Sequence, residues 1–214
     1  MLFRSLQVTG AATAIDTTGA GGGRGIVLIE SNTTLAADLT VNAPDTAAAE
    51  DAVFNGTVDD TSAGTNGLTV NTPGVVDING AIGSTIQLAS VTIDEGDSLS
   101  GTVAIGADIS ADSQTYNDAV IIDAAAVVLT GDTATFNGTI DGGAADNNAL
   151  TLNMSGTVDI NGAVGGTTRL ASVTTDAGGR TQIGASVSVD PLAGSQTYND
   201  AVILDTQTIV LTGT

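Results

Sequence analysis

Positive charge is almost missing from this sequence, which has four arginines, no lysine and no histidine against 24 Asp and Glu residues. The formal net charge of −20 repels phosphate backbones and anionic lipid headgroups. Nowhere do enough apolar residues follow one another to span a bilayer. We therefore expect no nucleic-acid partner and no direct membrane insertion. Cysteine is also absent, which excludes disulfide bonds, thiolate metal sites and thiol catalysis.

Aromatic residues are scarce as well, at 2% of the chain with no tryptophan, so the core must be thin and built from small apolar side chains. Only Glu30, Glu50 and Glu95 are glutamate, and the other acidic residues are aspartate, which favours turns over helix interiors. The 28 glycines and the abundant Thr, Val and Asn point the same way. These features predict an all-β protein.

Repetition is what the sequence has in abundance. Residues 51–132 and 133–214 align without a gap at an offset of 82, with about half of the positions identical. We interpret them as two tandem units, preceded by a degenerate or partial repeat with a Gly-rich segment in residues 1–50. Because the last unit stops on a repeat boundary without an amphipathic cap, we expect the natural polypeptide to be longer.

A shorter rhythm runs inside each unit. A large apolar residue followed by a turn-prone and then a β-branched residue recurs at spacings of 20, 24, 23 and 15, which together make one unit. This spacing predicts a right-handed parallel β-helix, a solenoid of about four coils per unit. The large residues are expected to stack one above another in a single column along the rod. The column consists of Tyr116, Phe136, Ile160, Ile183 and Tyr198, and Phe54 and Ile78 continue it in the preceding coils. Phe136→Ala should then destabilise the protein far more than the turn substitution Asp146→Ala.

Tandem Ig-like β-sandwiches are the alternative fold, since 82 residues is near the size of such a domain and Asn-Gly pairs suit hairpin turns. A β-sandwich requires a core layer of bulky side chains, often with a buried tryptophan, which this sequence lacks. It also does not explain the spacings of 15 to 24 residues within each unit. The β-helix is therefore the favoured prediction.

Catalytic chemistry finds little support in these residues. The pair Asp59 and Asp60 could serve as the two carboxylates of a β-helical polysaccharide lyase or hydrolase, but Asp60 becomes Gly142 in the next unit. Other carboxylates recur in both units, as structural residues do, and the expected pairs are these: Asp59 and Asp141, Asp77 and Asp159, Asp94 and Asp176, Asp108 and Asp190, Asp118 and Asp200, Asp123 and Asp205. We predict a protein that is not an enzyme.

One acidic cluster is a weak candidate for calcium. Asp94, Glu95 and Asp97 lie around a glycine, which suits a bent loop of oxygen ligands. The second unit keeps only Asp176 of the three acids. We expect no cofactor beyond this possible calcium ion.

The run NGAVGGTTRLASVTTDAGGRTQI from Asn161, followed by SQTYNDAVIL from Ser195, resembles the repeats of filamentous-haemagglutinin-like giant bacterial surface proteins, a β-strand-repeat adhesin family. The resemblance implies a structural shaft segment that is secreted or exposed on the outer cell surface of a bacterium. It implies a role in adhesion, aggregation or biofilm, with an S-layer or matrix protein as the alternative. The partner it implies is a host or bacterial cell-surface glycan or protein receptor. Separately, the open strand ladder of an uncapped β-helix suits end-to-end or lateral self-association.

Overall fold

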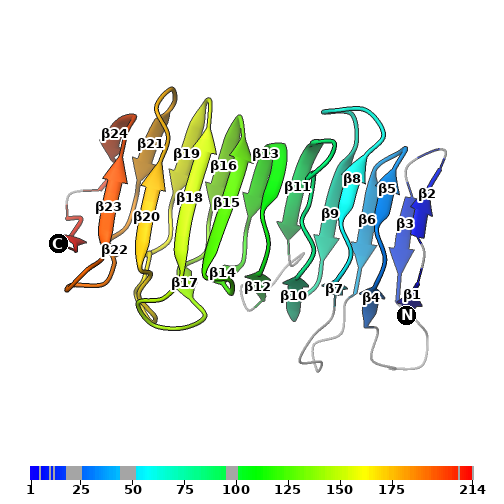
Figure 1. Cartoon of the computed structure of the whole chain (residues 1–214), viewed down its shortest axis with the longest axis horizontal. Helices are drawn as coiled ribbons and strands as arrows, with labels where there is room; N and C mark the ends of the chain where they lie inside the picture. The colour runs from blue at the N-terminus through cyan, green and yellow to red at the C-terminus, as the bar shows by residue number, and fades with distance from the viewer. Residues whose placement is uncertain are drawn as a thin grey trace.

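The computed structural model describes residues 1–4, 6–9, 11, 13–17, 26–43, 52–94, 101–206 and 208–213. All regular structure in these residues is β-strand. None of them forms a helix long and apolar enough to cross a membrane. The predicted β-solenoid is confirmed, because the strands pair in parallel with the strand one coil further along the chain (Figure 1).

The coils have three faces, and each coil contributes to each face a strand or, at Ile82 and Val164, a single bridged residue. The first face consists of β1 (Leu2–Phe3), β4 (Val27–Ile29), β7 (Ala52–Phe54), β10 (Val75–Ile78), β12 (Thr102–Ile105), β14 (Ala119–Ile122), β17 (Ile140–Gly142), β22 (Val187–Ser188) and β25 (Leu211–Thr212). A parallel bridge through Val164 connects β17 to β22.

The second face follows along the chain. It consists of β2 (Leu6–Val8), β5 (Thr33–Leu35), β8 (Val58–Asp60), β15 (Ala126–Gly131), β18 (Ala149–Met154), β20 (Ser172–Thr175) and β23 (Ser195–Tyr198). Bridges from Val58 to Ile82 and from Ile82 to Ile109 fill the gap between β8 and β15.

The third face completes the coil. It consists of β3 (Thr13–Asp16), β6 (Leu39–Asn42), β9 (Gly67–Asn71), β11 (Leu88–Asp94), β13 (Ile109–Tyr116), β16 (Thr133–Phe136), β19 (Thr157–Ile160), β21 (Arg180–Ile183) and β24 (Ala201–Leu204). Strand β13 turns the corner, because its first residues pair on the second face and its last four on the third.

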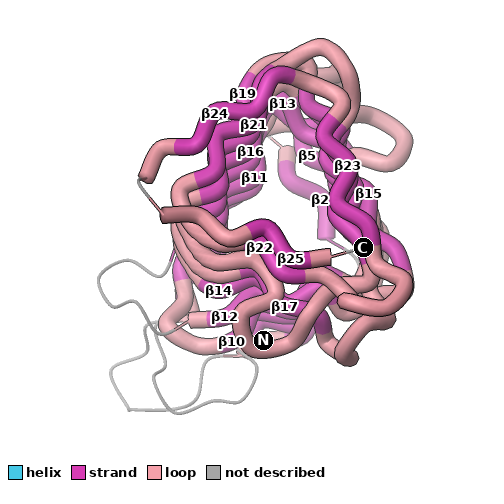
Figure 2. Tube along the Cα trace, turned by 90° about the vertical axis from the view of Figure 1, so that its left-hand side faces the viewer, coloured by secondary structure: helices cyan, strands magenta, loops and turns pink. Residues whose placement is uncertain are grey.

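Figure 2 shows the rod from its carboxyl-terminal end, with the three faces around a central core. From β22 to β23 and then β24 the chain runs anticlockwise while it advances toward the viewer, so the solenoid is right-handed (Figure 2). Inward and outward residues alternate along the strands, as in β18, where every second side chain is buried.

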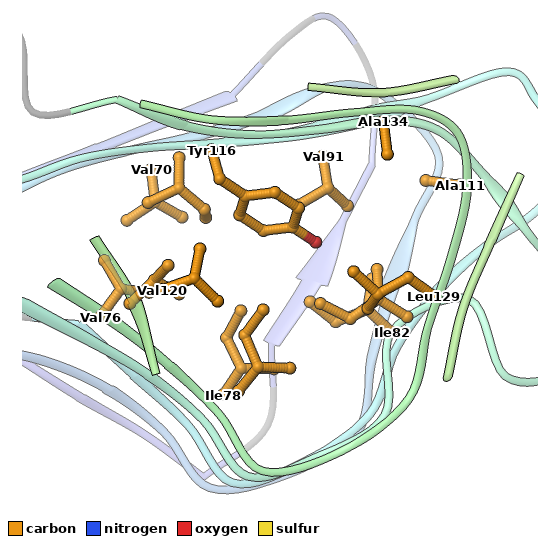
Figure 3. Packing of buried hydrophobic residues seen from close by; sticks show 14 of the residues in the cluster. Val70, Val76, Ile78, Ile82, Val91, Ala111, Tyr116, Val120, Leu129 and Ala134 are labelled. Carbon is orange, nitrogen blue, oxygen red and sulfur yellow. The ribbon is translucent and has the colours of Figure 1, made fainter. Parts of the chain in front are cut away.

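The interior is filled by columns of apolar side chains, one from each coil. On the third face Tyr116, Phe136, Ile160 and Ile183 are in register and fully or almost fully buried, as the sequence predicted. The rings of Tyr116 and Phe136 stack with their centroids 5.1 Å apart and their planes 12° apart. Figure 3 shows the Tyr116 ring pointing into the core among Val70, Val91 and Val120.

Three members of the predicted column lie elsewhere. Tyr198 is in register with Thr175 on the second face, and Leu204 takes the place above Ile183. Phe54 and Ile78 pair with each other on the first face. The prediction was wrong at these positions because it took one 82-residue unit as a whole number of coils.

The 82-residue repeat does not contain a whole number of coils, so equivalent residues of the two units lie on different faces of the rod. Phe54 is on the first face whereas its counterpart Phe136 is on the third, and Tyr116 on the third face corresponds to Tyr198 on the second. A unit therefore spans close to the predicted four coils but ends one face short of them. Equivalent residues of successive units consequently point in directions about a third of a turn apart.

Candidate functional site

Two columns of small residues, mostly serine and threonine, run along the third face in the first unit, with the buried Gly67 as the member that has no side chain. In the column nearer the start of the strand Gly67, Ser90 and Ser113 are in register, and two residues further along Thr69, Thr92 and Thr115 are in register. Thr40 and Thr135 extend the threonine column to five consecutive coils. We call this surface strip 1, defined by Gly67, Thr69, Ser90, Thr92, Ser113 and Thr115.

The same columns recur in the second unit, but on the second face. Strip 2 is defined by Ala149, Thr151, Ser172, Thr174, Ser195 and Thr197, each at an offset of 82 from its counterpart in strip 1. Five of the six positions are identical in the two strips. The sequence analysis missed these surfaces, although the alternating patterns SVT and SQT in both units were a signal for them.

Local contacts are the same in both units despite the change of face. The Tyr116 hydroxyl donates to Oε1 of Gln114 over 2.9 Å, and the Tyr198 hydroxyl donates to Oε1 of Gln196 over the same distance. Asn79 donates to the amide oxygen of Asn55 at one corner of the rod, and the equivalent pair in the second unit is Asn161 and Asn137, again at 3.0 Å. The unit therefore keeps its local structure as it rotates around the axis.

The pair Asp59 and Asp60 serves the backbone. Asp59 Oδ1 accepts from the amide of Thr85 at 2.7 Å, in the turn of the next coil. Asp141 likewise accepts from the amides of Thr167 and Thr168 at 2.8 and 2.9 Å, so the predicted equivalence of Asp59 and Asp141 is confirmed. Carboxylates that hold turns in both units fit a structural role better than acid-base catalysis.

The Asp60 carboxylate is surrounded by hydrogen-bond donors of its own turn. It is buried and accepts hydrogen bonds from the amides of Thr61, Thr65 and Asn66, and from the Asn66 side chain. Burial on its own would raise the pKa of Asp60, but hydrogen bonds from the Asn66 backbone and side chain and from neighbouring amides outweigh it, so the pKa lies below its usual value. The carboxylate is thus a fixed anion of the turn.

The predicted pairing of Asp108 with Asp190 is wrong. The amide of Val128 donates to Asp108 Oδ1 at 2.8 Å, and the corresponding amide of Val210 donates to Ser186 Oγ at 3.1 Å. Residues 105–112 and 183–190 therefore correspond at an offset of 78. The second unit has a shorter connection before β21 and regains the four residues at 191–194.

The calcium candidate is largely outside the described residues, which include neither Glu95 nor Asp97. Asp94 ends β11, in register with Asn71. Among the residues that the structure describes, no three acidic side chains gather into a metal-binding group.

Asp118 and Asp200 are another carboxylate pair that recurs in both units, as predicted. Asp118 is buried at a corner of the rod, where it lines an open depression together with Asn117 and Asn137. Its counterpart Asp200 accepts hydrogen bonds from the hydroxyls of Thr175 and Thr181 at 3.0 Å.

The fold and its repeats place the chain in the class of parallel β-solenoids. Over 138 residues it is 32% identical to "Outer membrane protein A" of Rickettsia rickettsii, a match that covers 64% of this chain and 6% of that protein. No protein-family model matches the sequence, and a search of solved structures gives no significant match. The described chain thus corresponds to a small part of the curated relative that it resembles.

Asp60→Asn should lower the free energy of unfolding at neutral pH by about 1–3 kcal/mol, because the neutral amide cannot accept all the hydrogen bonds that the carboxylate takes. The pKa of Asp60 is depressed in the folded state, so this contribution is present above about pH 4 and is lost as the pH falls through the lower folded-state pKa. Urea denaturation followed by circular dichroism from pH 7 to pH 2 measures it. Asp123→Asn, at an exposed corner, is the control and should change little; a difference between Asp60→Asn and wild type that does not shrink at low pH would contradict this role.

Proposed function

We propose that this chain is a non-catalytic shaft segment of a bacterial adhesin that is secreted or held on the outer cell surface, where it serves adhesion, aggregation or biofilm formation. The observation that carries the proposal is the uninterrupted ladder of parallel coils. On the third face one residue column runs from Ile15 to Leu204 through eight successive strand pairings. Such a rod would hold the receptor-binding part of an adhesin at a fixed distance from the cell surface.

The name of the Rickettsia relative supports an outer-membrane or cell-surface setting for this chain. The resemblance to filamentous-haemagglutinin-like repeats supports an adhesive role in particular. Because the match covers 6% of the relative, the activity and partners of the whole protein are part of the proposal. An S-layer or matrix protein would use the same rod without a receptor.

A polysaccharide lyase or hydrolase is the less favoured function. Both carboxylates of the only adjacent aspartate pair, Asp59 and Asp60, accept from backbone amides. The sequence holds no histidine or lysine that could act as a base beside them. We therefore assign the carboxylates to the scaffold.

An antibody raised against the purified segment tests the location on intact cells of the source organism. We expect labelling of unpermeabilised cells that is lost after brief protease treatment of the cell surface. A cytosolic protein serves as the control for leakage. Labelling that requires permeabilised cells would overturn the proposal, and a membrane or secreted-fraction blot with the same antibody would show where the protein is instead.

A further inference from the structure

Asparagine followed by glycine is the dipeptide most prone to spontaneous deamidation, because the glycine nitrogen can attack the asparagine side chain without hindrance from a Cβ atom. Folding slows this reaction wherever hydrogen bonds hold the two groups that must meet. The chain contains the dipeptide at Asn55, Asn66, Asn79, Asn137 and Asn161. The structure therefore decides which of the five asparagines can react.

Two of these dipeptides have the same sequence around them and can be compared directly. Residues 76–81 and 158–163 both read VDINGA, so Asn79 and Asn161 should react at similar rates in the unfolded chain. Both asparagines are exposed, and each donates from its side-chain amide to an asparagine of the preceding coil at 3.0 Å. A difference between them in the folded protein must come from their other contacts.

The Asn79 side chain has a second partner that Asn161 lacks. Asn79 Nδ2 also donates to Asp77 Oδ2 at 3.0 Å, so two acceptors hold the amide that has to turn toward the glycine. In the described part of the chain the corresponding carboxylate, that of Asp159, accepts nothing from Asn161, and its buried Oδ1 atom has no hydrogen-bond partner. The side chain of Asn161 is thus held by a single hydrogen bond, to Asn137.

The glycine amide, which is the attacking group, is also held at Asn79 and not at Asn161. Gly80 is buried, and its N–H donates to the Phe54 carbonyl at 2.9 Å. Gly162 is partly exposed, and its N–H finds no acceptor among the described residues. Gly162 also lines the open depression beside Asp118 and Gly138. Water can therefore reach the Gly162 corner.

In each of the other three dipeptides either the asparagine side chain makes two hydrogen bonds or the glycine amide makes one. Asn137 donates to Asn117 at 2.6 Å and accepts from Asn161 at 3.0 Å, Asn66 donates to the Leu35 carbonyl at 3.1 Å and to Asp60 at 2.6 Å, and Gly56, after Asn55, donates to the Ile29 carbonyl at 3.4 Å. Asn161 and Gly162 therefore have the fewest restraints of the five.

We propose that Asn161 is a site of spontaneous deamidation in the folded rod and that its repeat counterpart Asn79 is protected. The Gly162 nitrogen attacks Asn161 Cγ and forms a cyclic succinimide. The bond between Cγ and Nδ2 breaks, and the glycine amide proton passes through water to the leaving nitrogen, which departs as ammonia. A water molecule then adds to one of the two ring carbonyls and opens the ring, which leaves aspartate or isoaspartate.

The product alters this corner of the rod. A carboxylate in place of the amide cannot donate to Asn137 Oδ1, so that hydrogen bond between coils is lost. It adds a negative charge on the same turn as Asp159. Isoaspartate also lengthens the backbone where Gly162 packs closely on the carbonyl of Gly138. The inference goes beyond the proposed function and does not depend on it.

The test follows each asparagine in the purified, folded segment during incubation in a mildly alkaline buffer below the melting temperature. Peptic digestion and mass spectrometry measure the loss of each side-chain amide. Asn161 should react at least about fivefold faster than Asn79, because Asn79 and Gly80 must first break two hydrogen bonds that Asn161 and Gly162 do not make. In concentrated urea the two should react at the same rate, since their sequence neighbours are the same.

Two matched variants test the cause of the difference. Asp77→Ala removes the second acceptor of Asn79 and should raise the deamidation rate of Asn79 several-fold in the folded protein. Asp159→Ala is the equivalent change in the second unit and should leave the rate at Asn161 unchanged, since these two side chains share no hydrogen bond. Circular dichroism confirms that each variant is folded.

Three outcomes would overturn the inference. They are equal rates at Asn79 and Asn161 in the folded protein, an Asn161 that stays intact while the chain in urea reacts, and an Asp77→Ala variant in which Asn79 reacts no faster than in wild type. None of these results bears on surface location, which the antibody test decides separately.

Discussion

Phe136→Ala should lower the free energy of unfolding by about 3–5 kcal/mol. Phe136 is fully buried, so its removal leaves a cavity that the ladders on either side cannot close without breaking register. The substitution also removes the ring stack on Tyr116, which adds about 0.5–1.5 kcal/mol beyond the buried area. Urea denaturation followed by circular dichroism measures the loss.

The repeat provides a matched comparison. Phe54 is the counterpart of Phe136 and is equally buried, but it packs on Ile29 and Ile78 in its column rather than on a second ring. Phe54→Ala should therefore cost less than Phe136→Ala by about the stacking contribution. If Phe136→Ala cost no more than a surface substitution, the packing of this column would be wrong.

The surface control cannot be Asp146→Ala, which the sequence suggested as a mild turn substitution. Asp146 has a φ of 60° and forms two hydrogen bonds of 3.0 Å with the Arg169 guanidinium. Alanine would lose that ion pair and would be strained in the left-handed region. Asp123→Ala, at an exposed corner, is the better control and should stay within about 0.5 kcal/mol of wild type.

Gly162→Ala should be the second severe substitution, with a loss of about 3 kcal/mol. A Cβ atom on Gly162 would lie inside van der Waals contact with the carbonyl of Gly138 in the preceding coil. The atoms in the way belong to the backbone, beside the hydrogen bond between Asn161 and Asn137, so they cannot rotate aside. The coils would have to separate at this corner.

Gly166→Ala is the matched control, four residues further along the same coil. The nearest atom to its added Cβ would be the Ala163 Cβ at 3.6 Å, an ordinary contact. This variant should be as stable as wild type or slightly more stable, because alanine restricts the unfolded chain. Thermal unfolding compares the two variants, and equal melting temperatures would show that the corner tolerates a side chain.

The sequence by itself determined the class of fold and the local structure of each unit. Scarce aromatic residues, recurring turn residues and spacings of 15 to 24 residues were enough to predict parallel coils with a thin apolar core. It also predicted the stack of Tyr116, Phe136, Ile160 and Ile183, because these residues follow one another at single-coil spacing. Hydrogen bonds within a turn depend on neighbouring residues, and those are visible in a sequence.

Only the tertiary structure decided which face each residue occupies. The face depends on the accumulated length of all preceding coils, and the unit of 82 residues ends one face short of four coils. Tyr116 and Tyr198 have the same sequence neighbours, but Tyr116 is fully buried whereas Tyr198 is partly exposed near the end of the ladder. Burial raises the pKa of both phenols, that of Tyr198 to about 12 and that of Tyr116 further. The two hydroxyl strips point in different directions for the same reason, since a phase difference is a property of the whole coil path and not of any local motif.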